Sequence, residues 1–185
     1  MTLIHTNRFV LRPIEATDAP VFAHLCNDPL IARNTARIPH PYTLDDADEF
    51  CKAIARAFAL GTEYVFAVCD NEDIIACCGV MRVTNEIFDL GYWVAEHARG
   101  KGVAAEAAHA VASFAFERLQ AKTLLAGHYT DNPASGRVLE KTGFRKTGEI
   151  RKQFSVGRGG EADSARVRLD KADFIAPEAV QFMES

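Results

Sequence analysis

The chain has 185 residues, of which 48% are hydrophobic and 25% are charged, and its formal net charge at pH 7 is -4. This length predicts a single domain over residues 1–185, and the composition excludes a chain that is disordered, collagen-like or coiled-coil throughout. The mildly acidic charge argues against nucleic acid as a partner, because a nucleic-acid-binding protein usually presents a basic surface. No run of about 18 apolar residues is present, so no membrane span is predicted.

Cysteine and histidine usage indicates the compartment and argues against a metal site. The chain has five cysteines and six histidines. An odd number of cysteines without a C-x-x-C pair predicts reduced, mostly buried thiols in a cytoplasmic protein. The first eight residues have no basic start followed by an apolar stretch, so no secretory signal peptide is expected there. No histidine pair has the helical spacing of metal ligands, so no metal is predicted.

The first sixty residues carry signals for one strand and two helices separated by a proline-rich loop. Alternation of arginine with apolar residues is typical of a strand, and a capping residue followed by proline is typical of a helix start. The predicted elements are a strand over residues 8–14, a short helix from about Thr17 to Cys26, a loop over 27–43 holding one helical turn at most, and a helix from Thr43 to Gly61.

From residue 64 the pattern changes to short β-rich runs alternating with helical segments. The predicted elements are strands over 64–69 and 74–83 joined by a turn at 70–73, a strand over 87–94, an alanine-rich helix from about Val103 to Leu119, a strand over 124–129, a helix from Asn132 to Thr142, a strand from Phe144, a glycine-rich turn at 157–160 and a strand near 165–169. Hairpins with one β-α-β crossover predict an α+β fold whose mixed, mostly antiparallel sheet has helices on both faces.

The clearest chemical signal is the hexapeptide Arg99–Ala104 (RGKGVA), between a predicted strand and the alanine-rich helix. A helix N-terminus exposes unpaired N–H groups and a partial positive charge, which together make an anion site. Glycines leave the backbone open to a phosphate, and Arg99 and Lys101 add positive charge. A pyrophosphate fits this pattern. A glycine loop chosen only for its turn, with solvated basic side chains, explains it equally well.

Three phosphate-binding motifs compete for this loop. The Walker A motif fails, because Gly102 rather than Ser or Thr follows Lys101. The dinucleotide fingerprint is met in its glycines, but the strand over 124–129 has no acidic residue at its end, where that motif requires one. The pattern Arg/Gln-x-x-Gly-x-Gly/Ala is met from Arg99 to Ala104.

This loop is one of four segments that resemble the GNAT superfamily of acyl-CoA-dependent N-acetyltransferases, in particular its RimJ/RimL-type branch. The segments are Thr6–Pro13, Asp89–Val94, Arg99–Ala107 and Asn132–Phe144. Each segment alone is a weak signal, but their order and spacing are highly specific and span nearly the whole chain. The resemblance implies a GNAT-type fold and acetyl-CoA as cosubstrate. It also implies direct acetyl transfer to an amine in a ternary complex, without an acyl-enzyme.

The resemblance implies which residues hold coenzyme A. The residues expected at the pyrophosphate are Arg99, Gly100, Lys101, Gly102, Val103 and Ala104. The strand ending at Trp93 and Val94 would diverge from its neighbour and bind the pantetheine arm, and the N–H of Val94 would polarise the thioester carbonyl. Asn132 and Ser135 would lie near the pantetheine and the sulfur, although helix capping alone explains Asn132.

Two side chains are candidates for proton transfer. Asp89 is the candidate base, two positions before Gly91, where the branch that it resembles often carries glutamate. Its shorter side chain would need a bridging water, and an ordinary solvated carboxylate is the alternative. Ser135 is the candidate acid for the departing thiolate, because the position that carries a tyrosine in many relatives is Val138 here. Tyr129 as the acid, or a simple hydrogen-bonding role for Ser135, are the alternatives.

The acceptor amine is the least determined part of the interpretation. A protein α-amine has a pKa of about 7.7–8.0 and needs little help from a base, whereas a lysine has a pKa of about 10.4. The resemblance favours a ribosomal-protein-type N-terminal α-amine. The alternatives are a small-molecule amine (an amino acid, a polyamine or an antibiotic) and a catalytically silent acyl-CoA-binding module. Loops 27–43 and 152–164 are expected to set the acceptor, and the edge strands of such a fold would allow a homodimer.

Overall fold

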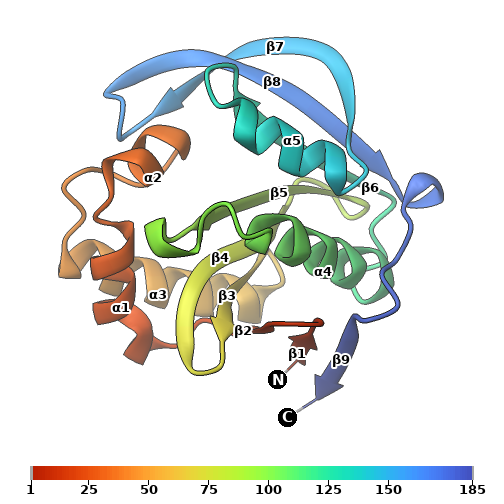
Figure 1. Cartoon of the computed structure of the whole chain (residues 1–185), viewed down its shortest axis with the longest axis horizontal. Helices are drawn as coiled ribbons and strands as arrows, with labels where there is room; N and C mark the ends of the chain where they lie inside the picture. The colour runs from red at the N-terminus through yellow and green to blue at the C-terminus, as the bar shows by residue number, and fades with distance from the viewer. Residues whose placement is uncertain (1, 185) are drawn as a thin grey trace.

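The computed structural model describes residues 2–184, which are built around one sheet (Figure 1). Within these residues the sheet has nine strands in the order β7-β8-β6-β5-β4-β3-β2-β1-β9. Neighbouring strands are antiparallel except for β5 and β6, which are parallel. The strands are β1 (Thr2–His5), β2 (Val10–Pro13), β3 (Glu63–Asp70), β4 (Asp73–Arg82), β5 (Ile87–Val94), β6 (Thr123–Tyr129), β7 (Arg145–Ser155), β8 (Gly160–Asp170) and β9 (Gln181–Glu184).

The helices begin and end where their capping residues require. The α-helices of the described residues are α1 (Ala19–Cys26), α2 (Pro29–Asn34), α3 (Leu44–Leu60), α4 (Val103–Glu117) and α5 (Pro133–Lys141). The Thr43 side chain caps α3 by accepting a hydrogen bond from the N–H of Asp46, and Gly61, with φ +70°, ends this helix. Asn132 caps α5, and Pro133 occupies its first turn.

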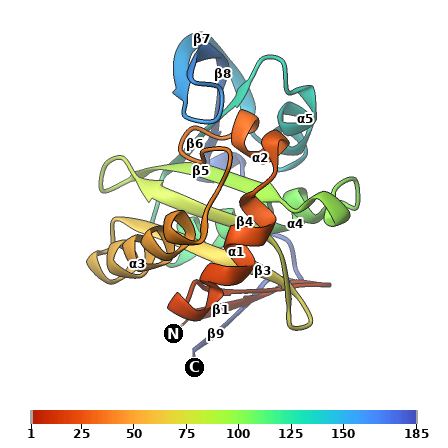
Figure 2. The same cartoon turned by 90° about the vertical axis from the view of Figure 1, so that its left-hand side faces the viewer.

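Helices cover both faces of the sheet, and each face has its own apolar core (Figure 2). On one face Phe88 and Leu90 of β5 are buried in the core that includes the alanines of α4. On the other face Trp93 of β5 packs against Phe22 of α1, with ring centroids 5.5 Å apart and planes at 89°. The alternation of side chains along β5 separates the two cores. The predicted α+β class with helices on both faces is confirmed.

The structure differs from the predicted elements at the ends of the chain and in the proline-rich loop. β1 and β9 were not predicted; they are four-residue strands that pair with each other, so the two ends of the chain lie side by side (Figure 1). The expected loop contains α2, whose first turn is capped by Asp28. β8 begins five residues earlier than predicted, at Gly160. Its polar sequence lacks a strand pattern, but pairing with both β7 and β6 overrides the local preference.

The five cysteines are buried and unpaired. Burial raises the pKa of Cys51 to about 11 and that of Cys26 to about 12, which keeps both thiols protonated near neutral pH. Among residues 2–184, no helix combines the length and the apolar character that crossing a membrane requires.

Two glycines that face each other across β4 and β5 predict opposite responses to a methyl group. A Cβ on Gly79 would lie 2.6 Å from the Tyr64 carbonyl oxygen and 2.7 Å from the Val65 Cα, whereas a Cβ on Gly91 would meet nothing within 4 Å. We expect Gly79→Ala to lower the free energy of unfolding by about 1–3 kcal/mol, because backbone atoms of β3 must move. Gly91→Ala should unfold at the wild-type denaturant concentration. Equal losses in the two variants would contradict this account of the sheet.

Candidate active site

The site is built where β5 and β6 stop pairing. Their parallel ladder runs from Ile87 opposite Thr123 to Leu90 opposite Ala126 and goes no further. β5 continues beside β4 as far as Val94, and β6 continues beside β8 as far as Tyr129. The two strands therefore diverge. We call the two segments that no longer pair with each other, residues 91–94 and 127–129, the wedge.

The backbone of Val94 is directed into the wedge. The N–H of the next residue, Ala95, donates to the carbonyl oxygen of Ile75 in β4, at 2.9 Å. Because successive peptide groups of a strand point to opposite sides, the N–H and C=O of Val94 point away from β4 and toward β6. The Arg99 Nε donates to this carbonyl oxygen at 3.1 Å. The N–H of Val94 therefore faces the wedge, and its role as an oxyanion donor stays a prediction.

The loop that follows β5 is shaped by two glycines in the left-handed region. Gly100 has φ +75° and Gly102 has φ +80°, a conformation that favours glycine, and a Cβ on Gly100 would meet nothing within 4 Å. The first hydrogen bond of α4 runs from the N–H of Glu106 to the Gly102 carbonyl oxygen, at 3.2 Å. The N–H groups of Val103 and Ala104 precede this bond and belong to the exposed helix start. Phosphate oxygens can therefore approach the backbone directly.

The positive charges around this loop differ from the sequence-based expectation. Arg99 is paired with Asp28, the residue that caps α2, so its charge is compensated within the protein. Burial opposes ionisation of Asp28, but hydrogen bonds from the Leu30 N–H and from Arg99 lower the pKa of this carboxyl. Lys101 is exposed to solvent.

Arg8, in the turn between β1 and β2, also reaches the loop. Its Nη1 donates to the Lys101 carbonyl oxygen at 2.9 Å, and its Nη2 lies 2.7 Å from the Glu106 Oε2. A Cβ on Gly102 would come within 3.4 Å of the Arg8 Nη2. Arg8 was expected only as part of a strand. Nothing in the local sequence indicates that it would lie against a loop more than ninety residues away.

On the α4 side of the wedge, Tyr92 meets Ser135. The Tyr92 hydroxyl oxygen lies 2.8 Å from the Ser135 Oγ and 3.2 Å from the Ser135 carbonyl oxygen. The N–H of Ser135 donates to the capping Asn132 Oδ1 at 3.3 Å. Burial raises the pKa of Tyr92, so its hydroxyl stays protonated. The sequence carries no signal for this contact between two residues that lie 43 positions apart.

Tyr129, considered as an alternative acid, is engaged elsewhere. Its hydroxyl donates to the Phe154 carbonyl oxygen at 3.3 Å, and the Arg158 guanidinium lies 4.4 Å from its ring centroid. Both partners belong to the β7–β8 hairpin. The geometry therefore favours Ser135 over Tyr129 as a proton donor in the wedge.

The other side of the sheet carries the residues that we call the Asp89 face: Asp89, Gly91 and Trp93. Asp89 is held by the buried Arg166 of β8, whose Nη2 is 2.7 Å from its Oδ2. Gly91 is exposed although it lies in a central strand, and the space above it is open. The side chain of Trp93 packs on α1, on the face away from α4. The expectation that the strand backbone at Trp93 binds the pantetheine arm stays a prediction.

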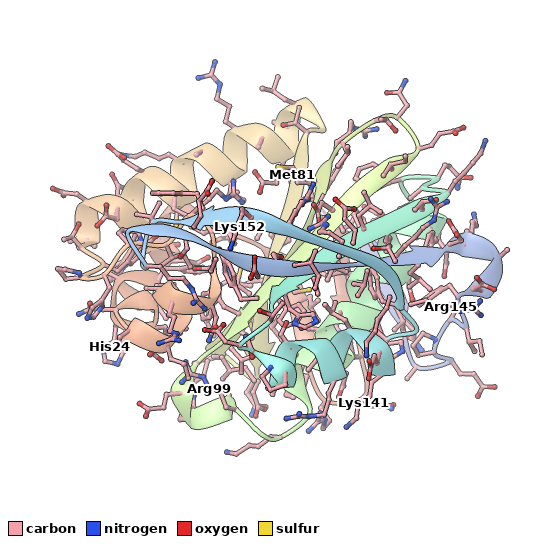
Figure 3. The ribbon with its side chains drawn as sticks, turned by 90° about the horizontal axis from the view of Figure 1, so that it is seen from above. His24, Met81, Arg99, Lys141, Arg145 and Lys152 are labelled. Atoms are coloured by element: carbon pink, nitrogen blue, oxygen red, sulfur yellow. The ribbon has the colours of Figure 1, made fainter. Side chains whose placement is uncertain are left out.

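The two loops expected to set the acceptor contact each other beside the Asp89 face. Seen from above, the β7–β8 hairpin, which carries Lys152, crosses the molecule (Figure 3), and it ends next to α2 (Figure 1). The buried Ser155 donates to the Thr35 carbonyl oxygen at 2.8 Å, and Arg158 donates to the Arg33 carbonyl oxygen at 2.7 Å. Arg158 also binds both oxygens of Asp131, at 2.8 and 2.9 Å. We call this set of contacts the clasp.

Among the described residues, no group of three or more His, Cys, Asp or Glu side chains is placed to hold a metal ion. The groups that the site presents are backbone N–H groups, the hydroxyls of Tyr92 and Ser135, and the ion-paired carboxylate of Asp89. Such a set can bind a phosphate, polarise a carbonyl and move protons.

Comparison with known proteins identifies the family. A profile described as "Acetyltransferase (GNAT) domain" matches residues 8–145. The chain therefore belongs to the GNAT acetyltransferases, and its class of activity is acetyl-CoA-dependent N-acetyl transfer. The loop at the start of α4 and the wedge fit coenzyme A, because both leave backbone groups open where a pyrophosphate and an extended arm would need them.

Individual relatives are distant in sequence and close in fold. "Probable N-acetyltransferase YjcK" of Bacillus subtilis is 27% identical over 154 residues, covering 79% of this chain and 85% of that protein. Ribosomal-protein-S5-alanine acetyltransferase from Vibrio fischeri has a TM-score of 0.79 at 18% identity, covering 94% of this chain and 98% of that one. Mycobacterium smegmatis RimJ, solved with a CoA-disulfide, has a TM-score of 0.81 at 19% identity, covering 93% and 88%.

Acetyl-CoA should raise the melting temperature of the protein, and Gly102→Val should abolish that rise. A ligand at a hundredfold excess over its Kd stabilises the native state by about 2.7 kcal/mol. NADH should give no shift. In the variant, a side chain at φ +80° strains the loop and occupies the phosphate position.

The matched control for backbone strain is Gly148→Val. Gly148 has φ +82° and lies in open space on β7. This variant should lose similar stability but keep the full shift with acetyl-CoA. If Gly102→Val retained the wild-type shift, the loop would not be the phosphate site.

Proposed function

We propose that this protein transfers the acetyl group of acetyl-CoA to the α-amine of a protein N-terminus, by direct attack within a ternary complex. The observation that carries the proposal is the two-sided wedge. Its α4 side offers the glycine loop, the Val94 N–H and the Tyr92–Ser135 pair, and its other side offers Asp89 beside the open space at Gly91. A thioester held on one side can thus be approached by an amine from the other.

Binding of the cosubstrate rests on backbone groups. In this proposal the N–H groups from Gly100 to Ala104 hold the pyrophosphate, and Lys101 adds a positive charge at the surface. The N–H of Val94 donates to the thioester carbonyl oxygen and stabilises the negative charge that develops there during attack. Bound acetyl-CoA supplies an activated acetyl group on a thiol leaving group.

Two side chains then handle protons. Asp89, through a bridging water, accepts the proton that the attacking amine loses. The Ser135 hydroxyl donates to the departing sulfur, and the Tyr92 hydroxyl fixes the orientation of the Ser135 Oγ. The thiolate is already a fair leaving group, because a thiol has a pKa near 8.5, so the donor contributes modestly.

An N-terminal α-amine is the acceptor class with the most support. Two solved structures of the same fold are, by their descriptions, a ribosomal-protein-S5-alanine acetyltransferase and a ribosomal L7/L12 alpha-N-protein acetyltransferase. An α-amine with a pKa of about 7.7–8.0 is partly neutral at physiological pH, which suits a weak carboxylate base. The clasp borders the Asp89 face, so a narrow acceptor such as a chain end suits it. The setting that we propose is the cytoplasm, where buried thiols remain reduced.

An amine panel with acetyl-CoA tests the acceptor class. Release of free coenzyme A thiol should be fast with unblocked peptides. It should be slow with N-blocked peptides that carry lysine, with polyamines and with free amino acids. Faster release with a small amine would move the assignment to a small-molecule acetyltransferase. A full thermal shift with acetyl-CoA but no thiol release from any amine would indicate a silent binding module.

Asp89→Asn should lower kcat, because an amide cannot accept the proton of the attacking amine. The loss should be largest at low pH and should shrink as pH rises from about 6 to 9, since more of the amine is then already neutral. Steady-state rates across this range measure the effect. Asp173→Asn, which removes a carboxylate from an exposed ion pair with Arg145, serves as the control. Unchanged turnover of Asp89→Asn at every pH would leave Asp89 without a role as base.

Ser135→Ala should lower turnover by roughly 10- to 100-fold, the low end of general acid catalysis, without lowering stability. Tyr92→Phe, which keeps the ring but removes the hydroxyl, should lower turnover by a smaller factor, because the Ser135 hydroxyl remains. Ser113→Ala is the matched control: Ser113 also lies in a helix, and its Oγ donates only to the His109 carbonyl four residues earlier. The melting temperature and the acetyl-CoA shift should be unchanged in all three. Wild-type turnover of Ser135→Ala would exclude this serine as the proton donor.

A further inference from the structure

A buried arginine crosses one strand to reach the candidate base. Arg166 lies on β8, directly opposite Gly127 of β6 in the strand register. Its side chain is only 8% exposed, and its Nη2 binds the Asp89 Oδ2 of β5 at 2.7 Å. The side chain therefore spans the whole width of β6 on the Asp89 face.

Gly127 is what makes this crossing possible. A Cβ at this position would lie 2.7 Å from the Arg166 Nη1 and 3.3 Å from its Cδ. A side chain here would displace the end of the arginine, which is flexible, rather than the backbone. A glycine in a strand weakens the sheet, so its presence indicates a close approach that the structure uses.

The pair is arranged to orient the carboxylate. One oxygen of Asp89 is held in a charge-assisted hydrogen bond, and among residues 2–184 no hydrogen bond to its Oδ1 is present. The Oδ1 is then the oxygen left to accept a proton. An aspartate side chain otherwise rotates between staggered positions, and misplacement of a reacting group by about 1 Å can cost on the order of 100-fold in rate.

Two other roles for Arg166 fit the structure less well. A site for a carboxylate of the acceptor would need an accessible guanidinium, and this one is buried. A purely stabilising ion pair would not need to cross a strand. Arg168, two residues along β8, pairs with Asp170 of its own strand at the surface, with 52% of its side chain exposed. Burying a charged pair is costly, and a buried pair is weak support for stability.

We propose that Arg166 is a positioning residue for the acetyl transfer, holding the Asp89 carboxylate oriented toward the attacking amine, with Gly127 as the gap through which the arginine side chain reaches. This inference rests on the proposed role of Asp89 as the base. It adds a requirement to the proposed role of Asp89: full activity also needs Arg166 on β8 and Gly127 on β6.

Steady-state kinetics of three variants test the proposal. Arg166→Met removes the charge and should lower kcat by about 10- to 100-fold while the KM for the amine stays near the wild-type value. Arg166→Lys restores a charge and should recover part of the loss. Gly127→Ala keeps both charged groups but displaces the arginine, and should lower kcat in the same way. Arg168→Gln is the control and should behave as the wild type.

Further measurements separate a positioning role from a structural one. All variants should keep the thermal shift with acetyl-CoA, because none touches the glycine loop. In the Asp89→Asn background, Arg166→Met should cause no further loss of kcat, since the residue that it positions is gone. If Asp89→Asn lowers kcat but Arg166→Met and Gly127→Ala do not, Arg166 has no positioning role and the base assignment stands. If Asp89→Asn itself has no effect on kcat, the base assignment fails.

Discussion

The early end of the β5–β6 ladder is the constraint on which the rest of the site depends. These are the parallel neighbours of the sheet, joined through α4, and their pairing stops at Leu90 and Ala126. Each strand then follows its other partner, β4 or β8, and the right-handed twist of the sheet separates them further. The divergence leaves the backbone of Val94 without a paired strand on its β6 side. On one face, the Tyr92 side chain of β5 reaches Ser135 of α5. On the other face, the sheet is open at Gly91.

Three glycines on the Asp89 side of the sheet show how one residue type serves three purposes. Gly79 lets β3 approach β4, because its missing side chain is replaced by backbone atoms of residues 64 and 65. The gap at Gly127 is filled by the Arg166 side chain. No atom fills the space at Gly91, which lies on β5, between the strands that carry Gly79 and Gly127, at the start of the wedge. Of the three positions, Gly91 alone leaves the space of its missing side chain open.

The sequence predicted the fold class, most elements and the position of the glycine loop, because each of these depends on local periodicity, capping or turn chemistry. It did not predict β1 and β9, which are four-residue strands: β9 pairs with β1, and β1 also pairs with β2. The side-chain partners in the site were also missed. Tyr92 with Ser135 and Asp89 with Arg166 join segments 43 and 77 residues apart. Such pairs are determined by the register of strands distant in the chain, and a single sequence carries no signal for that register.

The charge of Arg99 shows why a motif alone is an incomplete guide to chemistry. In the sequence this arginine looks like a phosphate ligand, but in the fold it is bound to Asp28 and to the Val94 carbonyl oxygen. Asp28 caps α2, and the residues that follow this helix accept the hydrogen bond from Ser155 of the clasp. The short α2 is thus tied at its start to the coenzyme loop and at its end to the β7–β8 hairpin. The guanidinium of Arg99 therefore joins α2 to the end of β5, and its expected role at the pyrophosphate stays a prediction.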